Sequence, residues 1–268
     1  MERFVKFCAT VGCVVSRQHR ESTHSREMNS GAQAPTGGPL SATSAKLYTP
    51  FILWLYDFVV HTLSNQFAWC CSSKNILIPF FQGHLPEGKN HLDVGVGTGY
   101  FLYHSNARLS SYDSIFLMDM NANALAQTKR RLESAGVSPE IIHSILHDAT
   151  RPWDKEQPPM FDSISAFYLL HCLSGSMAEK VQTVVSALKP HLNPVTGVLY
   201  GATILGDEAG HNALGRCLLE IYNWKGVFGN RGDKEGDLRD ALKEHFKEVD
   251  VQRHGKVALF TARRPIVS

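Results

Sequence analysis

The sequence lacks both a long hydrophobic run and a concentration of charge of one sign. Its 268 residues carry 27 basic and 25 acidic side chains, which gives a formal net charge of +2. Proteins that bind nucleic acids usually gather basic residues on one face. The one basic cluster, 129–131, lies late in a predicted helix, where the helix dipole favours cations. The most apolar run, 51–60, is too short to span a bilayer and contains Asp57. We therefore predict neither nucleic-acid binding nor a membrane span.

Cysteine is also sparse and scattered. The six cysteines form no C-x-x-C pair and no grouping with histidine at the spacing of metal ligands. Cys70 and Cys71 are adjacent, which is an awkward geometry for a disulfide between them. Reduced, mostly structural cysteines are typical of intracellular proteins. The sequence therefore predicts a cytoplasmic protein with no metal site.

The composition changes at residue 46. Residues 16–45 are polar and rich in Ser, Gly, Thr and Pro, and they cannot bury enough apolar surface to order themselves. We expect residues 1–45 to form a flexible, disordered leader, followed by one domain over 46–268. The aromatic-rich start of this domain, 46–85, predicts a helical cap. The long connection 206–232 is expected to form a lid insertion.

The rest of the domain alternates short apolar runs with amphipathic stretches, which is typical of a parallel sheet covered on both faces by helices. The predicted strands are 91–96, 114–120, 140–146, 161–170, 197–205, 246–254 and 256–261. A helix is expected to begin after Asn121 and end at Gly136, and a second begins at the capping box of Ser176 and Glu179. Only a tight turn at His254 separates the last two strands, so they should form an antiparallel hairpin.

A glycine-rich loop follows the first predicted strand, in the stretch HLDVGVGTGYFL. Gly95, Gly97 and Gly99 form G-x-G-x-G, whereas a dinucleotide fold requires a glycine where this chain has Tyr100. No Gly-Lys-Ser/Thr follows, so the loop is not a P-loop. Asp93, two residues before the first glycine, would repel a phosphate and attract a cation. The loop therefore indicates a nucleoside ligand with positive charge.

Two further acids follow the next two predicted strands. Asp119 ends the run IFLMD, where a carboxylate can accept hydrogen bonds from both hydroxyls of a ribose. Asp148 ends the run ILHD, where it could receive the exocyclic amine of an adenine. An acid at the end of one strand is a weak signal. Three acids at the carboxyl edge of successive strands are a much more specific one.

The series HLDVGVGTGYFL, IFLMDMN, LHDAT, FDSISAFYLLHCL and LKPHLNPVTGVLYGATIL, within residues 46–264, closely resembles the class I S-adenosylmethionine-dependent methyltransferases. The resemblance is strongest to the enzymes of microbial and fungal secondary metabolism that methylate small molecules. It implies a Rossmann-like, seven-stranded, mostly parallel sheet with the last strand antiparallel, helices on both faces and an N-terminal helical lid. It also implies a set of residues that hold S-adenosyl-L-methionine or its product S-adenosylhomocysteine: Asp93, Gly95, Gly97, Thr98, Gly99, Asp119, Met120, Asp148, Ala149 and Tyr48.

The predicted reaction is in-line transfer of the methyl group to a hydrophobic small molecule. A general base can assist an oxygen or carbon nucleophile. His171, directly after the fourth strand, and His211, in the lid insertion, are the candidate catalytic residues. The competing interpretation is a packed or cofactor-positioning histidine, and His211 is the second candidate after His171. The aromatic residues Tyr56, Tyr168 and Tyr222 are candidates for binding the substrate, and each has an alternative role in the core.

Two rival functions fit the same motifs. One is a cyclase or isomerase that binds the cofactor without methylating. The other is methylation of nucleic acid or protein, which is disfavoured because the fourth strand continues as AFYLL and not as an NPPY-like tetrad. The acceptor, the atom that receives the methyl group and the oligomeric state have no signature in the sequence.

Overall fold

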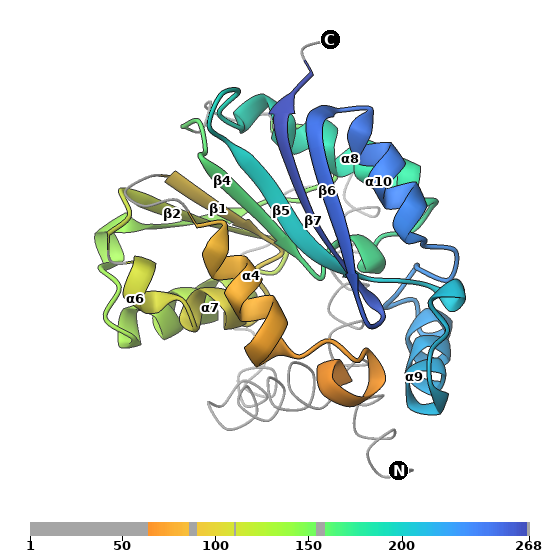
Figure 1. The fold of residues 1–268 in the computed structure, drawn as a ribbon. Coiled ribbons are helices and arrows are strands. Elements are labelled where there is room, and N and C mark those ends of the chain that lie inside the picture. Colours follow the sequence, from red (N-terminus) through yellow and green to blue (C-terminus); the bar gives the residue numbers. More distant parts are fainter. Residues whose placement is uncertain (1–63, 86–89, 110, 154–158, 267–268) are drawn as a thin grey trace, which may run out of the picture.

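The computed structural model describes residues 64–85, 90–109, 111–153 and 159–266. Their centre is a seven-stranded sheet in the order β3-β2-β1-β4-β5-β7-β6 (Figure 1). The strands are β1 (Asn90–Val94), β2 (Ser114–Asp119), β3 (Ile142–Leu146), β4 (Ser163–Phe167), β5 (Val198–Ile204), β6 (Phe246–His254) and β7 (Val257–Pro265). β7 runs antiparallel to both of its neighbours, whereas β1 to β5 pair in parallel. The predicted fold class is confirmed.

Two layers of helix cover the sheet. Residues 64–68 are helical, and the helical elements that follow are η2 (Ser73–Leu77), α4 (Ile78–Gly83), α5 (Tyr100–Tyr103), α6 (Asn106–Leu109), α7 (Ala122–Ser134), η3 (Pro139–Ile141), η4 (Leu170–Cys172), α8 (Met177–Leu188), η5 (Lys189–His191), η6 (Asp207–Ala209), α9 (Ala213–Trp224) and α10 (Glu235–Lys243). The side chain of Asn121 caps α7, and Ser176 and Glu179 form the predicted capping box of α8. None of the helices in the described part of the chain is both long and apolar enough to cross a bilayer.

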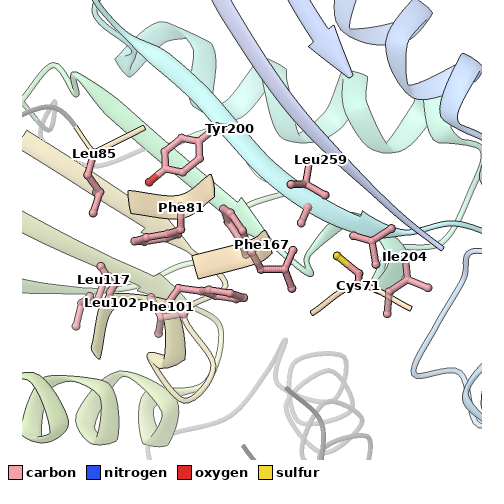
Figure 2. Close-up of a cluster of buried hydrophobic side chains, with 14 of the residues drawn as sticks. Cys71, Phe81, Leu85, Phe101, Leu102, Leu117, Phe167, Tyr200, Ile204 and Leu259 are labelled. Atoms are coloured by element: carbon pink, nitrogen blue, oxygen red, sulfur yellow. The ribbon is translucent and has the colours of Figure 1, made fainter. Parts of the chain in front are cut away.

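The central strands β4 and β5 are buried along their whole length, as is usual for parallel strands covered by helices on both faces. Figure 1 shows α4, α6 and α7 on one side of the sheet and α8 and α10 on the other. On the first side, Phe81 packs with ring centroids 5.7 Å from Tyr200 and 5.2 Å from Phe167 (Figure 2). Each such fully buried side chain contributes about 1.5–3 kcal/mol relative to an exposed one.

Several strand ends differ from the sequence prediction; β1, for example, ends at Val94 and not at residue 96. Residues 139–141 form the 3-10 turn η3, so the strand predicted from 140 begins at Ile142. The strand predicted over 161–170 is limited to β4, because Tyr168 has a φ of +59° and the chain then turns into η4. β7 continues to Pro265, four residues beyond the predicted end. Residues 1–63, with the predicted leader, the start of the helical cap, Tyr48 and Tyr56, lie outside the described residues.

Candidate functional site

The sheet order brings together the carboxyl ends of the strands that carry the predicted acids. β3, β2, β1 and β4 are consecutive neighbours and all run parallel. The segments that follow them therefore emerge side by side at one edge. Ligands of open α/β sheets bind in the crevice outside this edge, where the strand order reverses. In this chain the reversal lies between β1 and β4, next to the glycine loop.

The glycine loop has a backbone that other residues rarely adopt. Gly95, Gly97 and Gly99 have φ values of +72°, +53° and +68°. A Cβ on Gly99 would lie 2.6 Å from Thr128 Cγ2, so this glycine lets the loop pack directly on α7. Gly97 is exposed, and the nearest atom to a Cβ placed there is the carbonyl oxygen of Gly95 at 4.0 Å. The loop thus has one side packed on the protein and one side open.

Asp119 ties this loop to the end of β2. Its Oδ2 accepts a hydrogen bond from the Gly97 N–H at 3.1 Å, and its Oδ1 accepts one from the Asn121 N–H at 2.9 Å. These two bonds fix the Asp119 carboxylate beside the open face of the glycine loop. The half-buried Met120 follows directly, and the Thr98 carbonyl accepts a bond from Arg131 at 3.0 Å.

The Asp148 carboxylate contacts two residues that follow it closely in the chain. Its Oδ1 accepts hydrogen bonds from the Thr150 N–H at 3.0 Å and the Thr150 hydroxyl at 2.6 Å, and Arg151 lies 3.5 Å from Oδ2. Partial burial raises the pKa of Asp148, but the Thr150 bonds and the Arg151 charge outweigh it and the net change is downward. Ala149 is buried beside it. The adenine contact of Asp148 stays a prediction.

Asp93 is buried in the sheet beneath the glycine loop. Its Oδ1 accepts a hydrogen bond of 2.5 Å from the Ser165 hydroxyl on β4. Burial raises the pKa of Asp93 to about 7, and the nearby charge of Asp119 raises it as well, while the Ser165 bond lowers it. Both carboxylates that line this edge thus favour a cationic ligand over a phosphate.

The two candidate histidines lie near one aromatic cluster after β4. Phe228, in the loop after α9, has its ring centroid 4.5 Å from His171, 4.8 Å from Tyr222 and 6.3 Å from Trp69. Tyr168 lies 5.5 Å from the His171 ring. The structure therefore places two of the predicted residues, His171 and Tyr222, against Phe228, and a third, Tyr168, against His171. Phe228 is not among the residues predicted from the sequence. Its position could not be read from a pattern, because it lies 57 residues after His171.

His171 is buried, and its Nδ1 lies 3.5 Å from the backbone N–H of Ile204. Burial lowers the pKa of His171 to about 3, and the charge of Lys180 lowers it further. The ring is therefore neutral at pH 7. Because Nδ1 faces an N–H donor, the proton of the neutral ring belongs on Nε2. In this arrangement His171 offers a donor and no free basic nitrogen.

His211 has the opposite arrangement. Its Nε2 lies 3.0 Å from the Leu205 carbonyl and 2.9 Å from the Gly206 carbonyl, so Nε2 carries the proton. Its Nδ1 is buried and has no hydrogen-bond partner among the residues that the structure describes. The edge of the ring packs on Trp69 at 5.6 Å. The backbone thus fixes the tautomer in which Nδ1 carries the lone pair, and this nitrogen is buried next to Gly215 of α9.

The residues at this edge fit a positively charged nucleoside ligand. The open face of Gly97 admits a ligand next to the backbone, and the Asp119 carboxylate lies beside it. A model of the methyltransferase domain matches residues 92–199, from β1 to the start of β5. Methyltransferase ctvB of Aspergillus terreus is 40% identical over 220 residues, which cover 81% of this chain and 93% of that protein.

The chain belongs to the class I S-adenosylmethionine-dependent methyltransferases. The physcion biosynthesis cluster O-methyltransferase of Aspergillus chevalieri is 33% identical over 82% of this chain and 94% of that protein. An O-methyltransferase family protein from Burkholderia thailandensis has the same fold, with a TM-score of 0.58 at 13% identity over 83% of this chain and 62% of that chain. The methyltransferase uses S-adenosylmethionine as its cofactor. The roles of its individual site residues stay predictions.

Proposed function

We propose that this methyltransferase transfers the methyl group to an oxygen atom of a hydrophobic small molecule of secondary metabolism. The observation that carries the proposal is the aromatic cluster after β4, where Tyr168, Tyr222, Trp69 and Phe228 gather at the cofactor edge of the sheet. Aromatic side chains of this kind suit contact with an apolar, aromatic acceptor. Relatives whose names include O-methyltransferase, such as the physcion cluster enzyme, support oxygen as the nucleophile.

The bound cofactor supplies an electrophilic methyl sulfonium. The residues of the chain then have to align the acceptor oxygen and exclude water, which can supply several kcal/mol of the barrier. We assign the cofactor to the glycine loop, with Asp119 on the ribose and Asp93 near the methionine part. The segment 206–232, which contains η6 and α9, is proposed to cover the acceptor as a lid.

The geometry supports His211 over His171 as the general base. Two backbone carbonyls hold the proton of His211 on Nε2 and leave the Nδ1 lone pair free to accept a proton. His171 would first have to give up its contact with the Ile204 N–H. We therefore assign proton acceptance to His211 and assign His171 to positioning through its Nε2–H.

The matched variants His211→Gln and His171→Ala test this assignment. Glutamine at 211 keeps a donor for the two carbonyls but removes the base, so kcat should fall about 100-fold or more. Alanine at 171 removes one neutral hydrogen bond, so kcat should fall no more than about 10-fold. Neither variant is expected to change the affinity for S-adenosylmethionine. A larger loss of kcat at 171 than at 211 would reverse the assignment.

The reaction itself is tested by the mass of the product. The chain is incubated with S-adenosylmethionine and a panel of phenolic and enolic polyketide-like compounds, and products are analysed by mass spectrometry. The proposal predicts that one acceptor gains the mass of one methylene group, with an equal amount of S-adenosylhomocysteine formed. A rearranged product of unchanged mass would instead favour the cyclase or isomerase function.

A further inference from the structure

Four polar side chains lie inside the sheet, on the face of β1 and β4 that packs against α4. The parallel register places His91 opposite Ser163 and Asp93 opposite Ser165. Residues two apart on a strand share a face, so all four side chains point to the same side. None is more than 6% exposed. Burying a polar group costs free energy unless it is hydrogen-bonded, so these four side chains need partners within the sheet.

The four side chains form one hydrogen-bonded chain that ends on Asp93. His91 Nδ1 lies 2.7 Å from the Ser163 hydroxyl, His91 Nε2 lies 3.2 Å from the Ser165 hydroxyl, and Ser165 donates to Asp93 Oδ1 at 2.5 Å. When Asp93 is ionised it can only accept, so the Ser165 proton is committed to it. Ser165 must then accept from His91 Nε2–H, which leaves Nδ1 to accept from Ser163. Every donor therefore points toward the carboxylate.

The surroundings of Asp93 make the Ser165 bond important for its charge. Asp119 approaches from β2 and opposes ionisation of Asp93. Burial lowers the pKa of His91 to about 3, so its ring is neutral. Tyr200 of β5 and Tyr112, just before β2, also face this region, and burial raises the pKa of Tyr200 well above its usual value. In Figure 2, Tyr200 lies over Phe81 on this face of the sheet. These neighbours of Asp93 thus supply neutral or negative groups, and Ser165 stabilises the carboxylate.

We propose that Ser165 is a positioning residue for the cofactor: backed by His91 and Ser163, it holds the Asp93 carboxylate ionised and oriented to receive the ammonium group of the methionine part. The inference rests on the proposed placement of the cofactor at the glycine loop. Three observations support it: the strand register, the three contact distances, and the fact that each donor of the ionised state points toward Asp93. Chains of hydrogen bonds of this kind strengthen one another inside a protein.

A consequence is that cofactor binding is linked to a proton. The pKa of Asp93 is raised to about 7, so below pH 7 the free protein holds a proton on this carboxyl. An ammonium group binds the ionised form, so binding expels the proton and the affinity rises with pH up to about 7. Removing the Ser165 hydroxyl raises the pKa of Asp93 further. The rise in affinity should then occur at higher pH.

The test is calorimetric titration of the wild-type chain and of Ser165→Ala with S-adenosylhomocysteine between pH 6 and 9. This ligand has the ammonium group but a neutral sulfur, so its only positive charge is the one proposed to contact Asp93. At pH 6, titrations in two buffers of different ionisation enthalpy should show the wild-type chain releasing close to one proton. For Ser165→Ala the midpoint of the pH profile should move up by about 1–2 pH units, the value of one charge-assisted hydrogen bond.

At pH 7 this shift corresponds to about 5- to 50-fold weaker binding by Ser165→Ala than by the wild-type chain. Most of this loss of affinity should disappear by pH 9. Ser165→Thr, which keeps the hydroxyl, should restore the wild-type profile. Thr203→Val is the matched control, because it removes a fully buried hydroxyl on β5 that has no hydrogen-bond partner among the described residues. Its profile should match that of the wild type.

The outcomes separate this inference from the proposed cofactor site. If the wild-type profile is flat, or if Ser165→Ala weakens binding equally at every pH, the role of Ser165 is overturned while the cofactor site stands. If the folded wild-type chain does not bind at any pH, the proposed cofactor site fails and the inference fails with it.

Discussion

Replacing Asp119 with alanine is expected to abolish measurable binding of S-adenosylmethionine while leaving the chain folded. The variant loses the acceptor for the proposed ribose contacts, and it also releases the Gly97 N–H that the carboxylate now holds at 3.1 Å. Hydrogen bonds to charged groups contribute about 1.5–3 kcal/mol each. Two of them correspond to a loss of affinity of at least about 100-fold, since about 1.4 kcal/mol is tenfold. Calorimetric titration measures the effect directly.

Asp113→Ala provides a matched control for this variant. Asp113 is an exposed acid just before the start of β2, at the opposite end of the same strand. Removing it changes the net charge by the same amount without touching the glycine loop, so the affinity should be unchanged. Asp119→Asn, which keeps one acceptor oxygen but no charge, should show an intermediate loss. Near-wild-type affinity of Asp119→Ala would contradict the assignment of Asp119 to the cofactor.

Replacing Lys180 with methionine should destabilise the fold by about 3–5 kcal/mol, the cost of leaving one partner of a buried ion pair alone. Lys180 on α8 is fully buried, with Nζ 2.7 Å from both carboxylate oxygens of Asp233 and 2.8 Å from the Gly229 carbonyl. Methionine keeps the packing volume and removes the charge. Urea denaturation followed by circular dichroism measures the change in the free energy of unfolding.

Lys234→Ala is the matched control for Lys180. Lys234 directly follows Asp233 in the chain and pairs with Glu208 at 2.6 Å, but both side chains are exposed. Exposed pairs contribute about 0–1 kcal/mol, so this variant should change stability little. The double variant Lys180→Met with Asp233→Leu should regain much of the loss, because no buried charge is left alone. Equal effects of the two single lysine variants would contradict the account.

The Lys180–Asp233 ion pair lies next to the residues proposed for the acceptor site. Gly229, whose carbonyl Lys180 holds, donates its N–H to the His171 carbonyl at 2.9 Å. The neighbouring Phe228 is the residue around which His171 and Tyr222 pack. The two ends of the segment that contains α9 are also bonded to each other, because the Gly206 N–H donates to the Asp233 carbonyl at 2.8 Å. The ion pair therefore anchors the proposed lid to α8.

Much of the fold could be predicted from the sequence because its signals are local. Alternation of apolar runs with capped helices gave the seven strands, and the short turn at Gly255 required an antiparallel hairpin, which β6 and β7 form. The acids Asp93 and Asp119 and the three glycines lie at the predicted edge of the sheet. Among the described elements, several strand ends were wrong, for example where Tyr168 and Pro139 impose turns that apolar patterns do not reveal.

The atomic roles in the site could not be predicted in the same way, because they depend on contacts between distant residues. Lys180 and Asp233 are 53 residues apart, and Ser165 and Asp93 are 72 apart. A polar residue inside an apolar strand, as at His91 and Ser165, signals an inward polar contact but does not name its partner. The tautomer of His211 is likewise set by carbonyls that only the folded backbone brings to it.

Calorimetric titration of the wild-type chain with S-adenosylmethionine and, separately, with S-adenosylhomocysteine tests the central claim most directly. The account predicts that both bind with micromolar affinity to one site per chain and that Asp119→Ala removes this binding. Binding of neither ligand to a sample shown to be folded would contradict the account, because the glycine loop and the acids beside it would then hold no methyl donor.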